Sequence, residues 1–265
     1  MFTAYVDETG QQGKGLVIVS GFVGEDESWK RLSSEWPAGF GNSQRRSLHL
    51  KDWKFKSKNE RKLLERLGPI PERCGLIRVS GSVNVSDYSD LIEGSVAQVH
   101  AHGYSVATVP LILAIRGAIP RGERFEIVFE EQTALGFYRD KVLQHISLVM
   151  ERDPVVKSGE MPKQLVGWKT LTKGQTRLFE PADYLCYHLA HFASDPNSKR
   201  STWTRPIVGN GRVHIKHLTR DFVRHLFSLA PSLRIPQDQL DAMKLAIRTG
   251  TYDPWEEFFS DPENQ

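Results

Sequence analysis

The order in which strand-like and helix-like segments follow one another limits the fold of this chain most. Residues 2–7 and 16–23 are apolar and rich in β-forming residues, and a short glycine-bearing turn joins them, which predicts a β-hairpin. Further strand patterns occupy 76–85, 124–130 and 165–171, and helical patterns separate them. This alternation predicts a mixed sheet with helices on its faces, which is an α/β fold.

The helical segments are recognised by their apolar periodicity and their caps. Ser57 and Glu60 form a capping box, which predicts a helix that runs to about Leu67. Pro181 suits the first turn of a helix that begins at Glu180, because a missing N–H costs nothing there. We also expect helices over residues 25–36, 87–102, 106–118 and 135–151.

The pattern changes beyond residue 195. Residues 195–211 are polar and irregular, which predicts a loop, and three short helical patterns follow at 216–229, 237–249 and 254–259. The length of 265 residues suits one large domain with an appendage. We therefore predict an α/β domain over 1–195 and a small helical C-terminal extension over 196–265, packed on the same domain.

The cysteines and the apolar runs indicate the cellular compartment of the protein. Cys74 and Cys186 are the only cysteines, and each lies in an apolar setting without metal-ligand spacing, so they are expected to be core thiols in a reducing compartment. Met1 leads directly into a strand, without the pattern of a signal peptide. The longest apolar run, 106–115, is far shorter than the roughly 20 residues that cross a bilayer. We expect a cytoplasmic protein.

The basic residues are unevenly distributed, although the formal net charge is only +3. Residues 45–62 carry eight Lys or Arg against two acids, and residues 199–225 carry seven against one. Such segments either bind a polyanion or form solvated surfaces. On the first interpretation, nucleic acid is contacted by Arg45, Arg46, Lys51, Lys54, Arg212 and Lys216.

Three acids stand where α/β folds place their chemistry, at strand ends and helix starts. Asp7 ends the first strand, Glu130 or Glu131 ends a middle strand, and Asp183 lies one turn into the helix that begins at Glu180. Neighbouring strand residues point to opposite faces, so only one acid of the middle pair can join the others. Hard divalent cations require such carboxylates, and two of them support phosphodiester cleavage. Turn or capping roles are the alternative.

His49 is the best candidate histidine for catalysis. It lies beside Lys51 and Asp52 in a basic segment, where it can act as an acid, a base or a phosphate contact. A surface histidine without a catalytic role is the alternative. The chain contains no phosphate-binding loop, no dinucleotide-binding fingerprint and no nucleophile elbow.

Four short motifs occur in order over residues 1–195: Tyr5–Gly10 (YVDETG), Leu48–Leu50 (LHL), Phe125–Glu131 (FEIVFEE) and Phe179–Leu185 (FEPADYL). The first resembles the Asp-Glu-Ser-Gly signature that opens the bacterial family called domain of unknown function 3800. The second resembles the His-containing element of that family. The third resembles its middle strand, which ends in Asp-Glu, and the fourth resembles its Gln-x-Ala-Asp helix start.

The resemblance implies a ribonuclease-H-like fold and a presumed nuclease. It carries over Asp7, Glu130 and Asp183 as ligands of Mg²⁺ or Mn²⁺, with Glu8 as a supporting catalytic acid. Two positions depart from the family pattern, because Glu130 stands in place of Asp and Glu180 in place of Gln. Glu180 is a further candidate ligand, and either change can also retune or weaken the site.

The sequence therefore predicts a divalent-metal-dependent nuclease or phosphodiesterase that acts on nucleic acid. The alternative is a catalytically inactive ribonuclease-H-like module that binds nucleic acid or another protein. A hydrolase of a small phosphorylated molecule is the third interpretation. The choice between RNA and DNA, the mode of cleavage and the oligomeric state stay open.

Overall fold

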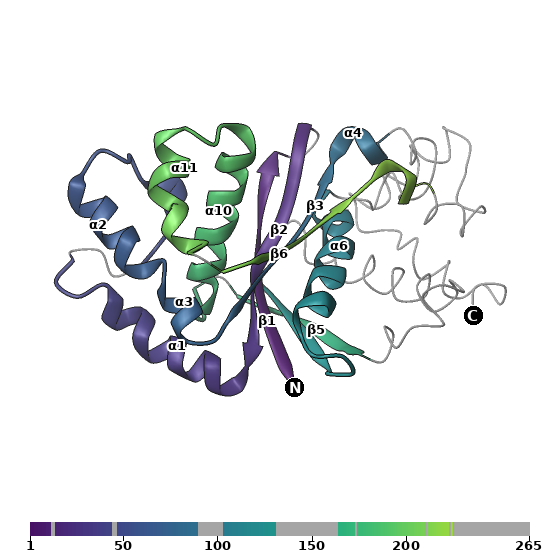
Figure 1. The fold of residues 1–265 in the computed structure, drawn as a ribbon, viewed down its shortest axis with the longest axis horizontal. Coiled ribbons are helices and arrows are strands. Elements are labelled where there is room, and N and C mark those ends of the chain that lie inside the picture. The colour runs from purple at the N-terminus through teal and green to yellow at the C-terminus, as the bar shows by residue number, and fades with distance from the viewer. Residues whose placement is uncertain are drawn as a thin grey trace, which may run out of the picture.

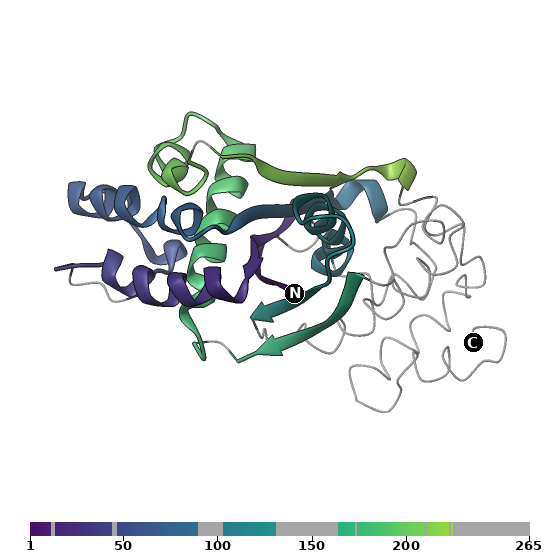
Figure 2. The same cartoon turned by 60° about the horizontal axis from the view of Figure 1, so that its bottom comes forward.

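The computed structural model describes residues 1–11, 14–43, 47–89, 103–130, 164–172, 174–209, 211–222 and 224. These residues form a six-stranded mixed sheet with helices on both faces (Figures 1 and 2). The predicted α/β class, with a mixed sheet flanked by helices, is confirmed. No helix among the residues described here is long and apolar enough to cross a membrane.

The sheet combines an antiparallel meander with parallel strands. Its strands are β1 (Phe2–Gln11), β2 (Lys14–Glu25), β3 (Ile77–Asn84), β4 (Phe125–Glu130), β5 (Leu165–Leu171) and β6 (Val213–Leu218), in the spatial order β5-β4-β1-β2-β3-β6. The pairs β1–β2 and β2–β3 are antiparallel, whereas β4 is parallel to β1 and β5 is parallel to β4. The carboxyl ends of β1, β4 and β5 therefore meet at one end of the sheet.

The helices divide between the two faces of the sheet. The described helices are α1 (Asp26–Gly39), η1 (Leu50–Asp52), α2 (Lys58–Leu67), α3 (Ile70–Arg73), α4 (Val85–Tyr88), α6 (Gly103–Ala118), η2 (Arg177–Phe179), α10 (Glu180–Ser194), α11 (Lys199–Thr204) and η3 (Arg205–Ile207). In Figure 1, α6 lies on one face of the sheet, and α1, α2, α10 and α11 lie on the other.

Alternation along β1 supplies a different core to each face. Val6 belongs to the core that α6 covers, together with Leu111 and Ile115 of that helix. Tyr5 packs against the opposite core, which contains Leu185 of α10. Because successive strand residues point to opposite faces, Asp7 follows Tyr5 onto the face that α10 covers. The hydrophobic pattern of β1 thus decides which helix Asp7 meets.

Gly81 of β3 allows α6 to approach closely. A Cβ atom at this position would lie 2.2 Å from the backbone nitrogen of Leu111 and 2.4 Å from the carbonyl oxygen of Ala107. Any side chain at position 81 would therefore push the helix away from the sheet. The contact fixes α6 against β3 and leaves the other face to α10.

Several sequence predictions are tested by these elements. The five predicted strands are present, and the Ser57–Glu60 capping box is confirmed, with Asn59 N donating to Ser57 Oγ at 3.1 Å and Ser57 N donating to Glu60 Oε2 at 3.3 Å. The helix predicted over 135–151 lies outside the described residues, as does most of the helix predicted over 87–102.

The C-terminal prediction needs correction where the structure describes the chain. The segment 195–211, predicted as a loop, contains α11 and η3, and residues 216–218, predicted as helical, belong to β6. Val213 and Ile215 alternate with His214 and Lys216, which is the period of a strand, and the open edge of β3 accepts it. The sheet therefore continues past residue 195. The helices predicted at 237–249 and 254–259 lie outside the described residues.

Arg78 joins this added strand to the rest of the fold. Its side chain is buried on β3, Nε donates to the carbonyl oxygen of Ile207 at 2.7 Å, and Nη2 pairs with Glu72 Oε2 at 2.8 Å. A buried charge needs such partners, since burying it without them would cost several kcal/mol. The guanidinium thereby ties β3 to η3, just before β6.

We expect Arg78→Met to lower the free energy of unfolding by about 2 kcal/mol, because the carbonyl of Ile207 loses a charged donor. Urea unfolding followed by circular dichroism measures this change. Arg73→Met is the matched control, since the Arg73–Glu35 pair spans 3.5 Å between exposed side chains and should contribute little. Equal losses in the two variants would contradict the role given to Arg78.

Candidate functional site

Asp7 and Glu130 lie side by side where the parallel pairing of β1 with β4 stops. Glu130 ends β4, but β1 runs on past Asp7 beside β2, so the prediction that Asp7 ends the first strand is wrong. Val6 of β1 is opposite Phe129 of β4, so Asp7 and Glu130 occupy the next position of each strand. Phe129 belongs to the core under α6, and alternation turns Glu130 to the opposite face, where Asp7 also points. Glu130, and not its neighbour Glu131, is therefore the acid that shares a face with Asp7. Glu131 lies outside the described residues.

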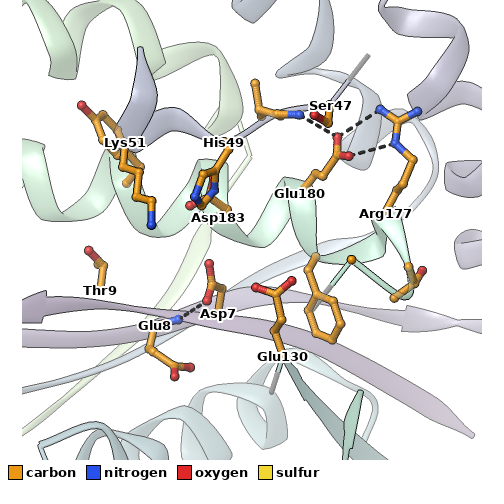
Figure 3. A pocket seen from close by; sticks show the side chains of 15 residues that line it. Asp7, Glu8, Thr9, Ser47, His49, Lys51, Glu130, Arg177, Glu180 and Asp183 are labelled. Atoms are coloured by element: carbon orange, nitrogen blue, oxygen red, sulfur yellow. Dashed lines mark hydrogen bonds and ion pairs between the residues drawn. The ribbon is translucent and has the colours of Figure 1, made fainter. Parts of the chain in front are cut away.

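Asp183 is brought to the same place by α10. The residues that follow it, Tyr184 and Leu185, are fully buried, whereas the side chain of Asp183 is 22% exposed. Its Oδ2 accepts a hydrogen bond from the backbone nitrogen of Leu50 at 3.2 Å. Figure 3 shows the carboxylates of Asp7, Glu130 and Asp183 pointing into the same space, two from the sheet and one from the helix above it.

This space is a pocket of about 500 Å³ with mixed charge. Its acids are Asp7, Glu8, Glu130, Glu180 and Asp183. Its basic residues are His49, Lys51 and Arg177, and Thr9, Ser47, Thr176 and Tyr187 also line it. The fold thus assembles the acids of three predicted motifs, and the histidine of the fourth, around one cavity.

Asp7 is the most buried acid of the pocket, with 8% of its surface exposed. Its Oδ1 accepts one hydrogen bond, from the backbone nitrogen of Glu8 at 2.8 Å, and no Lys or Arg of the described chain forms an ion pair with it. Burial raises the pKa of Asp7 well above its usual range, and the negative charges of Glu8, Asp183 and Glu130 raise it further. An ionised Asp7 therefore has acidic neighbours and no ion-pair partner among the described Lys and Arg side chains.

The backbone of Asp7 is held by Cys186 of α10. The thiol donates to the carbonyl oxygen of Asp7 at 2.9 Å and lies 2.8 Å from the hydroxyl oxygen of Ser20. Both cysteines are buried and form no disulfide, which confirms that they are core thiols. This contact fixes β1, at Asp7, directly against the helix that carries Asp183.

Glu180 has quite different surroundings from Asp183, although both lie in the first turn of α10. Its carboxylate accepts hydrogen bonds from Trp36 Nε1 at 2.7 Å, from the backbone nitrogen of Leu48 at 3.1 Å and from Arg177 Nε at 2.8 Å. A second bond from Arg177 Nη2, at 3.2 Å, makes the ion pair bidentate. Donors of the protein itself therefore occupy the carboxylate that was predicted as a further metal ligand.

The segment 47–50 is clamped between the two acids of α10. The backbone nitrogens of Leu48 and Leu50 donate to Glu180 and Asp183 respectively, so alternate residues of the segment meet acids one helical turn apart. His49 lies between these two bonds, and its Nδ1 is 3.7 Å from Asp183 Oδ2. The clamp thus sets the position of the predicted catalytic histidine.

Glu8 differs from the other acids in direction. Figure 3 shows its side chain extending to the opposite side of β1 from Asp7, as strand alternation requires. It borders the pocket and its charge acts on Asp7, but its carboxylate does not face Asp183. A supporting electrostatic role suits this placement better than direct contact with a substrate.

The predicted nucleic-acid contacts do not gather at one place. Lys51 lines the pocket, and Lys54 is exposed outside its lining. Arg212 and Lys216 lie just before and on β6, which β2 and β3 separate from β1. The remaining two, Arg45 and Arg46, lie outside the described residues.

Sequence reasoning missed two residues of the pocket, Arg177 and Tyr187. Arg177 precedes Glu180 by three residues, and Tyr187 follows Asp183 by four, which are the spacings of neighbours on a helix surface. These spacings were the available signal. Arg177 lies in η2, ahead of the predicted helix, which hid its relation to Glu180.

No similarity to a known protein helps to interpret this site. Comparisons with protein-family models, with curated proteins and with solved structures found no match. Within the described ranges, no three His, Cys, Asp or Glu side chains form a group that could hold a metal ion as they stand. The site has to be interpreted from its own residues.

We expect Asp7→Asn to raise the free energy of unfolding at pH 7, because the parent loses stability when this buried carboxyl ionises. The folded-state pKa of Asp7 is above its unfolded value, so the folded chain binds the extra proton, and stability falls as the pH rises from the unfolded pKa to the folded one. The amide removes this cost and still accepts from Glu8 N.

Urea unfolding between pH 4 and pH 8, with a chelator present, measures the effect. Asp52→Asn, at an exposed acid near the pocket, is the matched control and should leave the pH dependence unchanged. An Asp7→Asn variant that is less stable than the parent at pH 7 would show that the charge at Asp7 is compensated.

Proposed function

We propose that this protein is a divalent-metal-dependent phosphodiesterase that cleaves nucleic acid, built on a ribonuclease-H-like fold. The observation that carries the proposal is the convergence of Asp7, Glu130 and Asp183, from two neighbouring strands and one helix, on a pocket that also contains His49 and Lys51. These elements are a first strand, a middle strand and a later helix, which are the places that the family resemblance implies.

The donor chemistry of the pocket fits Mg²⁺ or Mn²⁺. All three acids offer carboxylate oxygens, and the uncompensated charge at Asp7 favours a cation. Mg²⁺ is usually held by one or two carboxylates together with water and substrate phosphate. The three acids therefore need not form a complete ligand set before the metal and the phosphate bind. A bound divalent cation would activate a water molecule and stabilise the leaving oxygen of a phosphodiester.

The basic residues of the pocket would bind and orient the phosphate. Lys51 forms no ion pair with any acid of the described chain, so its ammonium group is available for a phosphate oxygen. Arg177, in contrast, is held by Glu180 in a bidentate ion pair. We therefore assign phosphate binding to Lys51, and we assign to Arg177 and Glu180 the positioning of the 47–50 segment.

His49 is placed for proton transfer. Its Nδ1 faces Asp183, an arrangement that orients the ring and directs Nε2 elsewhere. The side chain is 37% exposed, so it can exchange protons with solvent between turnovers. In this proposal His49 donates a proton to the leaving oxygen or accepts one from the attacking water.

The second candidate is a nucleic-acid-binding module without catalysis. It is favoured by one observation, that no group of three ligands stands assembled within the described residues. On this alternative, charge reversal of the basic residues weakens nucleic-acid binding, whereas amide substitutions of the acids do not. The two candidates therefore differ in what the acids do.

We expect the protein to bind Mn²⁺, and Asp183→Asn and Asp7→Asn to weaken this binding at least tenfold, because each removes a charged ligand. Isothermal titration calorimetry measures it, with Asp52→Asn as the control that keeps the parent affinity. A second titration with a non-hydrolysable dinucleotide present covers a metal that binds only with phosphate. Parent-like affinity in both amide variants would contradict the assignment.

We expect His49→Gln to lower kcat on a labelled oligonucleotide by about 10²–10⁴-fold, the usual contribution of an acid–base group. Mn²⁺ affinity should stay within threefold of the parent, since the histidine is not assigned as a ligand. Lys54→Gln, five residues along the same segment and outside the pocket lining, is the control. An unchanged kcat in His49→Gln would remove the histidine from the mechanism.

A further inference from the structure

One stripe of α10 continues from the pocket along the helix. Asp183, Tyr187 and His191 follow one another at steps of four residues, so they lie on the same side, about 6 Å apart along the axis. Asp183 and Tyr187 line the pocket, and His191 lies one turn beyond it. The Tyr187 and His191 rings touch, with centroids 4.3 Å apart.

This stripe is supported by a buried aromatic side chain. The ring of Phe55 stacks on Tyr187 with centroids 5.6 Å apart and planes at 12°. Phe55 is buried and has a φ of 51°, which makes it the only non-glycine residue with positive φ in the described chain. The three rings form a column that begins in the core and reaches the surface at His191.

Positive charge accompanies the rings. Arg200 of α11 is exposed, and its guanidinium carbon lies 6.0 Å from the centre of the Phe55 ring. Burial raises the pKa of Tyr187 and lowers that of His191, and the charge of Arg200 lowers both pKa values. Arg200 forms no ion pair with an acid of the described residues.

We propose that Tyr187, His191 and Arg200 form a binding track for single-stranded nucleic acid, which holds the nucleotides next to the phosphate in the pocket. The inference rests on the proposed function, because the pocket supplies the start of the track. Arg200 binds a backbone phosphate, and His191 offers a half-buried ring to a base.

The ring column selects the single-stranded form. Bases of a duplex are stacked on each other and turn only their edges outward, whereas unpaired bases can stack on protein rings. His191 serves as a ring rather than a charge, since its lowered pKa keeps it neutral near pH 7. Each step of the stripe is comparable to the distance between successive phosphates of an extended strand.

The test is binding of fluorescein-labelled RNA and DNA single strands of 2 to 12 nucleotides, measured by anisotropy with a chelator present so that nothing is cleaved. In the parent, affinity should rise with length. Arg200→Glu should weaken binding of the 12-mer at least tenfold, and His191→Ala should weaken it about threefold. A 12-base-pair duplex should bind the parent more weakly than either single strand.

Arg124→Glu is the matched control, because it changes the net charge equally on an exposed residue directly before β4, at the opposite end of that strand from the pocket. Equal effects of Arg124→Glu and Arg200→Glu would overturn the track, as would a parent that binds no 12-mer. Failure of the proposed nuclease activity is distinguishable from failure of the track. Binding that depends on Arg200, without metal-dependent cleavage, would support the binding track and contradict the catalytic function.

Discussion

The arrangement of the pocket depends on the carboxylate of Glu180. Only 12% of its side chain is exposed, and such a charge is stable only when donors surround it. Trp36 reaches it from α1, Leu48 from the segment before η1 and Arg177 from η2. The start of α10 and the adjoining η2 are thereby joined to two parts of the chain that are distant in sequence, and the positions of His49 and Asp183 follow from this junction.

The acids on either side of the pocket contrast in their electrostatics. Glu180 accepts four hydrogen bonds, two of them from a guanidinium, whereas Asp7 accepts one backbone hydrogen bond and faces other carboxylates. The donors around Glu180 stabilise its ionised carboxylate. The ionised form of Asp7 is destabilised by burial and by its acidic neighbours, and only a cation or a proton can relieve this destabilisation. A cost maintained in a folded protein is typical of functional sites, which supports the proposal for Asp7.

Much of this site could be predicted from local sequence patterns, and the rest could not for identifiable reasons. The predicted ends of the strands pointed to Asp7 and to one of Glu130 and Glu131, because the period of two lets only one of that pair face the site, and the motif resemblance chose Glu130. The same reasoning did not find β6, since its strand pattern runs directly into a segment that resembles a helix. The partners of Glu180 were also hidden, because Trp36 and Leu48 are more than 130 positions away along the chain. Contacts of that separation depend on tertiary packing, which single-sequence patterns do not encode.

The two departures from the resembled motifs carry different weight in the light of these contacts. A glutamine at position 180 would offer one oxygen to three sets of donors and would turn its own amide hydrogens toward Arg177, Trp36 or Leu48. Glutamate at position 180 is therefore matched to the Arg177 guanidinium that it pairs with. Glu130 has no such explanation in the described contacts. Under the proposed function, the longer side chain of Glu130 at the end of β4 is the departure that bears directly on metal binding.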